Sequence, residues 1–186
     1  MLDFRPPVLW VNWGEALLRS KNYVEAINKL SIGVAQQDVH LVAQALAYRG
    51  YCHMNLGEGY YPEARKDLED AIVKDEQLVF AYHTLGLLEA QEGNYAAAVP
   101  RYEKALEYNP RQFTTRYNLA IAYARLNKLG DARKEFEELA QSAPPNSVEA
   151  IAANAWLAEN PIPSAGGAAT AESHGGNGDG REQADS

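Results

Sequence analysis

Cysteine and long apolar runs are scarce in this sequence of 186 residues. The single cysteine, Cys52, excludes an internal disulfide and is typical of proteins in reducing compartments. No apolar run approaches the roughly 18 residues of a membrane-spanning helix. The opening letters MLDFRPPVLW also lack the positively charged start and the apolar stretch of a secretory signal. We therefore predict a cytoplasmic protein that does not insert directly into a membrane.

Positive charge is also in short supply. The chain has 17 Lys and Arg against 25 Asp and Glu, which gives a formal net charge of −8. Binding to nucleic acid needs clustered Lys and Arg that face the phosphates. The composition thus excludes nucleic acid from the expected partners, whereas basic partners would be attracted.

Residue patterns for catalysis or metal binding are missing as well. The four histidines show no metal-ligand spacing, and neither a GxGxxG nor a GxxxxGK[ST] phosphate loop occurs. Acidic pairs such as Glu69–Asp70 and Glu137–Glu138 stand beside Lys and Arg, as on solvated helix faces. The sequence predicts no enzyme activity, no cofactor and no metal.

What the sequence does have is a period of about 34 residues. Small residues recur at Gly14, Gly50, Gly86 and Ala120, and again at Ala26, Ala64, Ala98 and Ala132. Tyr23, Tyr61, Tyr95 and Leu129 recur in the same register, and Pro144 follows Pro110 by 34 residues. Such self-similarity predicts a stacked array of helices.

Each unit holds two short amphipathic segments separated by a turn signal. The signals are Ser20–Asn22, Gly57–Pro62, Gly93–Asn94 and Asn127–Asp131. We expect two antiparallel helices that approach closely at Gly86 and Ala98, and we expect Pro110 to end the second helix. Pro100 lies past the first turn of its helix, where it predicts a local kink.

These residues resemble the tetratricopeptide repeat (TPR) family. The matching positions are Leu85, Gly86, Gly93, Tyr95, Ala98, Tyr102, Ala105 and Pro110, together with residues 49–64 and 117–144. Gly33 and Arg116 depart from the family pattern. The resemblance implies an all-α fold, an α-solenoid (right-handed superhelix) of four helix-turn-helix hairpins plus a C-terminal capping helix. The repeats are expected at residues 7–40, 43–78, 79–112 and 113–146.

Two further segments follow the last repeat. Residues 147–160 are expected to form the capping helix, in which Asn146 and Glu149 resemble a capping box. One helical stripe would cover the end of the array; it contains Val148, Ile151, Ala152, Ala155 and Glu159. Residues 161–186 are rich in Gly, Ala and Ser and nearly lack large apolar side chains, which predicts a disordered acidic tail.

In the TPR family the first helices line a concave groove that holds peptides or partner helices. On this pattern the groove consists of Val8, Val11, Asn12, Tyr48, Tyr51, Phe80, His83, Leu87, Tyr117, Asn118, Ile121 and Arg125. It is a mixed aromatic and aliphatic surface, and aromatic anchors commonly dominate binding energy. One subtype clamps a C-terminal carboxylate with Lys, Asn and Arg, and here only Asn118 keeps the expected residue type.

The resemblance therefore implies a protein-binding adaptor or assembly scaffold that holds an apolar peptide or helix of another protein. Three alternatives stay open. The chain could self-associate as a structural homo-oligomer, or dock as an accessory subunit on a membrane protein complex. Its groove could also be covered from within, by Met1–Pro7 or by the tail.

Overall fold

Every amphipathic segment that the sequence predicts forms a helix in the computed structural model, which describes residues 6–161. Within this range there are nine α-helices, one short 3-10 helix and no strand. The helices are α1 (Pro7–Arg19), α2 (Tyr23–Val34), α3 (Val39–Leu56), η1 (Glu58–Tyr60), α4 (Tyr61–Lys74), α5 (Val79–Gln91), α6 (Tyr95–Tyr108), α7 (Phe113–Arg125), α8 (Leu129–Ser142) and α9 (Val148–Glu159). The predicted tail and most of the segment Met1–Pro7 lie outside the described residues.

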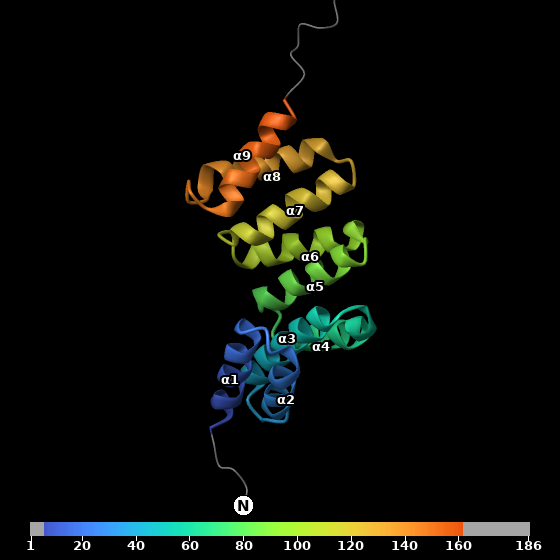
Figure 1. Cartoon of the computed structure of the whole chain (residues 1–186), viewed down its shortest axis with the longest axis vertical. Coiled ribbons are helices and arrows are strands. Elements are labelled where there is room, and N and C mark those ends of the chain that lie inside the picture. The colour runs from blue at the N-terminus through green and yellow to red at the C-terminus, as the bar shows by residue number, and fades with distance from the viewer. Residues whose placement is uncertain (1–5, 162–186) are drawn as a thin grey trace, which may run out of the picture.

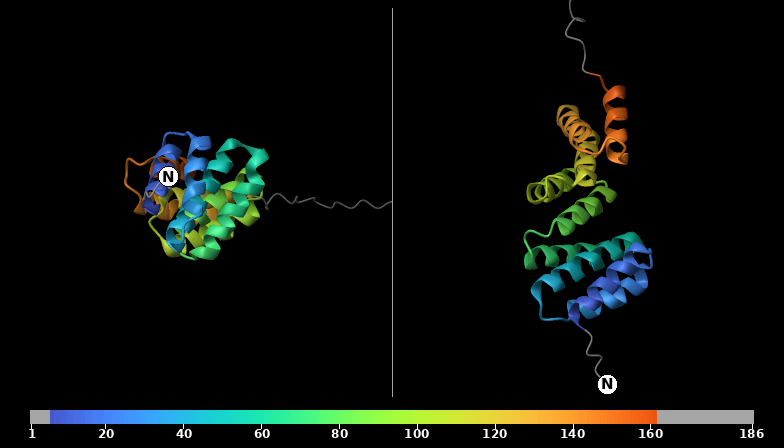
Figure 2. Two further views of the ribbon diagram at one scale, coloured as in Figure 1. Left: turned by 90° about the horizontal axis from the view of Figure 1, so that it is seen from below. Right: turned by 90° about the vertical axis from the view of Figure 1, so that its left-hand side faces the viewer.

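The helices pair as antiparallel hairpins that follow one another along the long axis of the molecule (Figure 1). α1 pairs with α2, α3 with α4, α5 with α6 and α7 with α8, and α9 packs on α8 and α7. The first helices also contact one another in order, from α1 to α3, α5, α7 and α9. They form one continuous layer, here called the first-helix wall, and Figure 2 gives two further views of the stack. The fold is the all-α solenoid of four hairpins and a C-terminal helix that the sequence predicts.

The hydrophobic core is divided into four clusters, each of which joins one hairpin to a neighbouring helix. One cluster links α1 and α2 to α3, and a second links α3 and α4 to α5. A third links α5 and α6 to α7, and the last links α7 and α8 to α9. Each unit therefore depends on its neighbours for burial, as in other repeat proteins.

Glycines allow the first and second helices of a pair to approach closely. A Cβ atom at Gly86 would lie 2.6 Å from Cε1 of Tyr102, and one at Gly14 would lie 2.4 Å from Cγ of Leu30. The contact differs in detail from the predicted one, because Gly86 faces Tyr102, one helical turn beyond Ala98. Ala98 itself is fully buried.

All four hairpin turns use a left-handed residue at the same place in the repeat. The φ angles are 61° at Lys21, 110° at Gly57, 78° at Gly93 and 57° at Asn127. Glycine adopts this conformation without the steric penalty that other residues meet. The turn signals therefore mark the turns correctly, although two of the four units lack the glycine.

Pro100 does not end its helix. α6 runs from Tyr95 to Tyr108 with Pro100 inside it, and the proline side chain is exposed. The missing N–H thus falls on the solvent side of the helix, where water can serve the carbonyl that loses its partner.

The terminal helix α9 covers the array with a different face from the predicted one. Ala150 and Ala153 are buried against α8, and the Trp156 ring stacks on Phe136 at 4.6 Å between centroids. By contrast, Val148 is 80% exposed and Ile151 is 59% exposed. The predicted stripe of Val148, Ile151, Ala152, Ala155 and Glu159 was therefore wrong as the covering face.

The cap of α9 also differs from the prediction. The hydroxyl of Ser147, rather than the side chain of Asn146, accepts a hydrogen bond from the Ala150 N–H at 3.2 Å. Glu149 does not close a capping box but accepts a hydrogen bond from the Thr114 hydroxyl of α7 at 2.7 Å. This bond ties α9 to the preceding first helix.

Candidate protein-binding surface

The first-helix wall holds eleven of the twelve predicted groove residues at least partly exposed. The exception is Val11, which is 1% exposed and lies in the cluster between α1, α2 and α3. Gly33 provides the space, since a Cβ atom there would lie 3.2 Å from Cγ2 of Val11. Val11 is thus a core residue, and the prediction that it lines the groove was wrong.

Three aromatic rings meet on the wall where α3 faces α5. The Phe80 ring lies 5.1 Å from that of Tyr48 and 5.8 Å from that of Tyr51, measured between centroids. The Tyr48–Phe80 pair is edge-on, a favourable geometry for aromatic rings. All three side chains are half-buried, so each still presents part of its surface to solvent.

An ion pair of α1, between Glu15 and Arg19, lies next to this aromatic cluster. Burial, together with the nearby Glu15 carboxylate, raises the pKa of the Tyr48 hydroxyl. Glu15 in turn accepts a hydrogen bond from Arg19 at 2.7 Å, one turn further along α1. The aromatic cluster is therefore bordered by a paired carboxylate, and the hydroxyl of Tyr48 stays uncharged at neutral pH.

His83 was predicted as a polar-tipped groove residue, but its side chain is directed into the wall. Nδ1 of His83 lies 2.8 Å from the Thr115 hydroxyl of α7, and its ring lies 6.1 Å from that of Tyr102. Burial lowers the pKa of His83 to about 4. The imidazole is therefore neutral near pH 7 and connects α5 to α7.

This lowered pKa predicts a pH-dependent stability. An unfolded histidine has a pKa of about 6.5, so the unfolded chain binds the proton more tightly than the folded one. The free energy of unfolding should fall as the pH drops from about 6.5 to about 4, by up to about 3 kcal/mol from this residue. Urea unfolding at a series of pH values measures the loss, and a His83→Gln variant should lose less.

The exposed His40 supplies the matched control for this experiment. Its side chain is 83% exposed, so His40→Gln should still show the loss of stability that follows from the burial of His83. Equal pH slopes for wild type and His83→Gln would contradict the assignment.

The remaining wall residues differ in how firmly they are held. The Tyr117 ring packs edge-on against the buried Phe136, and Ile121 belongs to the same cluster. Leu87 packs against two of the core clusters. Asn118 is half-buried, whereas Val8, Asn12 and Arg125 are exposed. The half-buried apolar side chains thus lie in the middle of the wall, on α3, α5 and α7.

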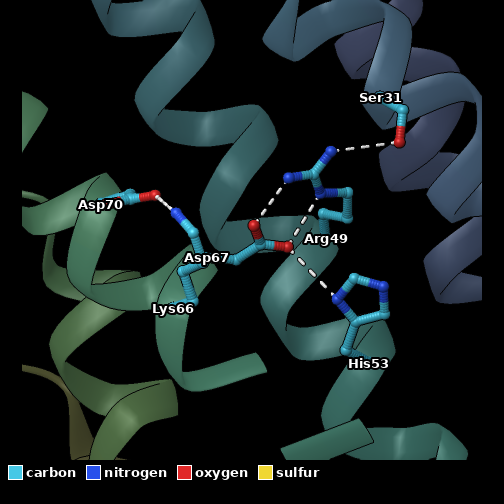
Figure 3. A network of polar contacts seen from close by, with 6 residues as sticks. All are labelled: Ser31, Arg49, His53, Lys66, Asp67 and Asp70. Atoms are coloured by element: carbon cyan, nitrogen blue, oxygen red, sulfur yellow. Dashed lines mark hydrogen bonds and ion pairs between the residues drawn. The ribbon is translucent and has the colours of Figure 1, made fainter. Parts of the chain in front are cut away.

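A buried polar network lies at the α3–α4 contact (Figure 3). Arg49 donates two hydrogen bonds to Asp67, at 2.8 and 2.6 Å, and a third to the Ser31 hydroxyl at 3.1 Å. Nδ1 of His53 lies 3.2 Å from the same carboxylate. Sequence reasoning missed this network, because Arg49 and Asp67 are 18 residues apart and no local pattern links them.

A second buried carboxylate, Glu89, joins α5 to its neighbours. Its Oε1 lies 3.2 Å from Nη1 of Arg65 and 3.6 Å from Nε of Arg101. Both networks connect neighbouring helices of the array. Among the described residues, no three His, Cys, Asp or Glu side chains gather as a metal site would require.

Cys52 has no reactive character in this fold. It is fully buried, and burial raises the pKa of its thiol to about 12. The reactive form of cysteine is the thiolate. Cys52 therefore acts as a small core residue between α1, α2 and α3.

None of the described helices combines the length and the apolar character that crossing a lipid bilayer requires.

Comparison with known proteins agrees with this architecture. Residues 83–147 match the family model described as tetratricopeptide repeat. The solved structure of MamA has a TM-score of 0.63 at 21% identity, over 84% of this chain and 83% of that one. MamA from MSR-1 gives 0.63 at 24% identity, over 82% of this chain and 85% of that one.

A further solved structure is described as that of YrrB, a TPR protein with an unusual peptide-binding site. It has a TM-score of 0.62 at 16% identity, over 83% of this chain and 79% of that one. No curated protein sequence matches the chain. Residues 83–147 thus match the tetratricopeptide repeat family, and the described part of the chain has the solenoid fold of MamA and YrrB.

Proposed function

We propose that this chain is a protein–protein interaction scaffold, an adaptor or assembly factor that holds an apolar peptide or helix of a partner on its first-helix wall. The observation that carries the proposal is the cluster of Tyr48, Tyr51 and Phe80. Rings that are fixed by their neighbours yet partly exposed lose little conformational entropy on binding. Such residues are enriched among those that dominate interface energies.

The layout of the wall supports the same function. Half-buried apolar side chains on α3, α5 and α7 form a surface that crosses several helices, with exposed polar residues such as Asn55, Gln91 and Arg125 towards the helix ends. An apolar centre with a polar rim is the usual organisation of a protein interface. YrrB, which shares the fold, is described as having a peptide-binding site.

The test compares capture of cellular proteins by the wild type and by a Tyr51→Ser/Tyr117→Ser variant, read by mass spectrometry. Loss of the two rings should remove the partner, because both contribute apolar surface to the wall. The matched control is Tyr60→Ser/Val73→Ser, which changes a 47% exposed tyrosine and an 82% exposed valine off the wall. Thermal unfolding of each variant verifies that it folds.

Two results would contradict the proposal. Capture of the same proteins by the wild type and the wall variant would place binding on another surface. A stable homo-oligomer of the wild type in dilute solution, dissociated by the wall substitutions, would instead assign the wall to self-association.

A further inference from the structure

The terminal helix α9 occupies the place of a fifth first helix. Val148, Ile151, Ala155 and Glu159 each follow a wall position of α7 by 34 residues; those positions are Thr114, Tyr117, Ile121 and Arg125. α9 packs on α8 and α7, as α7 packs on α6 and α5. Its position and its register are therefore those of the repeat, although no second helix follows within the described residues.

The exposed apolar side chains of α9 lie on the stripe that continues the wall. Two large apolar side chains of α9, Val148 and Ile151, are 80% and 59% exposed. Asn154 stands at the repeat position that Gly14, Gly50 and Gly86 hold in the first three units, where the two helices of a pair approach closely. Its side-chain amide donates a hydrogen bond to the Ala150 carbonyl at 2.9 Å. A polar residue there is unsuited to pairing with a further helix. The apolar stripe of α9 is thus suited to contacting a ligand of the wall, whereas α9 is not suited to packing against the second helix of another repeat.

The tail has little with which to cover this stripe. Ile162 is the only large apolar residue in 162–186, so the tail offers too little apolar surface to fill the wall. A second copy is also a poor match, since the only charged residues of α9 are Glu149 and Glu159. Two such helices side by side would bring like charges together, which is destabilising.

The two carboxylates of α9 instead fit a basic partner, although the exposed Arg125 lies on the neighbouring wall helix α7. Glu149 is held at the junction of α7 and α9 by the Thr114 hydroxyl. This bond and a backbone N–H lower the pKa of Glu149, so its carboxylate is charged at neutral pH. A helical partner fits better than an extended one, because the apolar wall centre cannot pair the backbone groups of an extended chain. A helix satisfies those groups internally.

We propose that α9 is the fifth helix of the binding wall, and that the wall takes a basic amphipathic helix of another protein. The apolar stripe of that helix contacts Val148 and Ile151, and its Lys and Arg residues face Glu149 and Glu159. This inference rests on the proposed function. It adds that the binding surface extends over α9 and that the ligand is a basic amphipathic helix.

The test uses two synthetic helical peptides of about 18 residues, or five turns, each with leucines at i, i+3, i+4 and i+7. Lysines flank the stripe in one peptide and glutamates in the other. Fluorescence anisotropy should give the lysine peptide at least about tenfold higher affinity, which falls as salt screens the charges. Glu149→Gln/Glu159→Gln should reduce both the affinity and its salt dependence.

Val148→Ser/Ile151→Ser should lower the affinity for the lysine peptide by about tenfold, because apolar area is lost from the interface. The control Val73→Ser changes an 82% exposed valine on α4 and should bind as the wild type does. Both sites are largely exposed, so folding is not at risk, and thermal unfolding checks this.

The outcomes separate the two proposals. If Tyr51→Ser/Tyr117→Ser loses the peptide while Val148→Ser/Ile151→Ser keeps it, the wall binds partners but α9 does not take part. If both variants bind the lysine peptide as the wild type does, the peptide binds off the wall, and both the wall and the role of α9 are overturned. If the wild type binds neither peptide, the basic helical ligand is overturned, whereas the wall stands or falls with the capture experiment. Equal affinity for the two peptides would overturn the basic partner.

Discussion

Replacing Asp67 with asparagine is expected to lower the free energy of unfolding by about 3 kcal/mol, as when a buried ion pair loses one partner. Asp67 is 5% exposed and accepts two hydrogen bonds from Arg49. The amide would leave the guanidinium, itself largely buried, without a counter-charge. Urea unfolding at pH 7 measures the change. An equal dependence of the free energy on urea concentration in wild type and variant would show that the compactness of the folded and unfolded states is unchanged.

Two controls make this expectation specific. Asp70→Asn removes the carboxylate of an exposed pair with Lys66 and should change stability by less than about 1 kcal/mol. Arg49→Met/Asp67→Leu replaces the pair by apolar side chains and should recover part of the loss. Similar losses in Asp67→Asn and Asp70→Asn would contradict the role of burial.

The Arg49–Asp67 network also determines how the contribution of Asp67 to the free energy of unfolding changes with pH. Burial by itself raises the pKa of Asp67, but the two hydrogen bonds and the charge of Arg49, together with the nearby His53, outweigh it and lower the pKa below its ordinary value. The folded chain therefore holds the proton less tightly than the unfolded one. The contribution is complete above a pH of about 4 and is lost as the pH falls through the lowered pKa.

The turns and helix pairs could be read from the sequence because their determinants are local. Glycine or asparagine marks three of the four left-handed turn positions, and Lys21 is placed by its register alone. Likewise, the two helices of a pair can approach closely only where the first helix has a small residue, as at Gly14, Gly50 and Gly86. These requirements repeat in each unit, so one unit supports the interpretation of the next.

The wall was harder to predict, because it depends on contacts between units. Gly33 breaks the family pattern, and the space that it leaves draws Val11 into the core. Arg116 stands where the family has a large aromatic residue, and it pairs with Glu135 at 2.7 Å. Neither outcome follows from helical periodicity, since the neighbouring helix decides what each position contacts.

α9 illustrates the same limit on a single helix. It has two stripes of small and apolar residues, the predicted one with Val148 and Ile151 and another with Ala150, Ala153 and Trp156. The second stripe packs on Phe136 and Leu139 of α8. Helical periodicity by itself does not select between two such stripes, so the prediction took the wrong side.

Gly86→Ala is expected to lower the free energy of unfolding by about 2 kcal/mol, the range for overpacking a core. The added Cβ would lie 2.6 Å from Cε1 of Tyr102, whose ring is only 1% exposed and has no room to move. The loss outweighs the gain of about 1 kcal/mol that alanine brings to a helix interior.

Chemical denaturation of Gly86→Ala and Gly130→Ala would separate these two effects. No atom lies within 4 Å of a Cβ at Gly130 in α8, so alanine there should be neutral or stabilising by up to about 1 kcal/mol. A Gly86→Ala/Tyr102→Ala double variant should be more stable than the sum of its single changes predicts, because removing the ring removes the clash. If Gly86→Ala is as stable as the wild type, the close approach of α5 and α6 is not what requires glycine here.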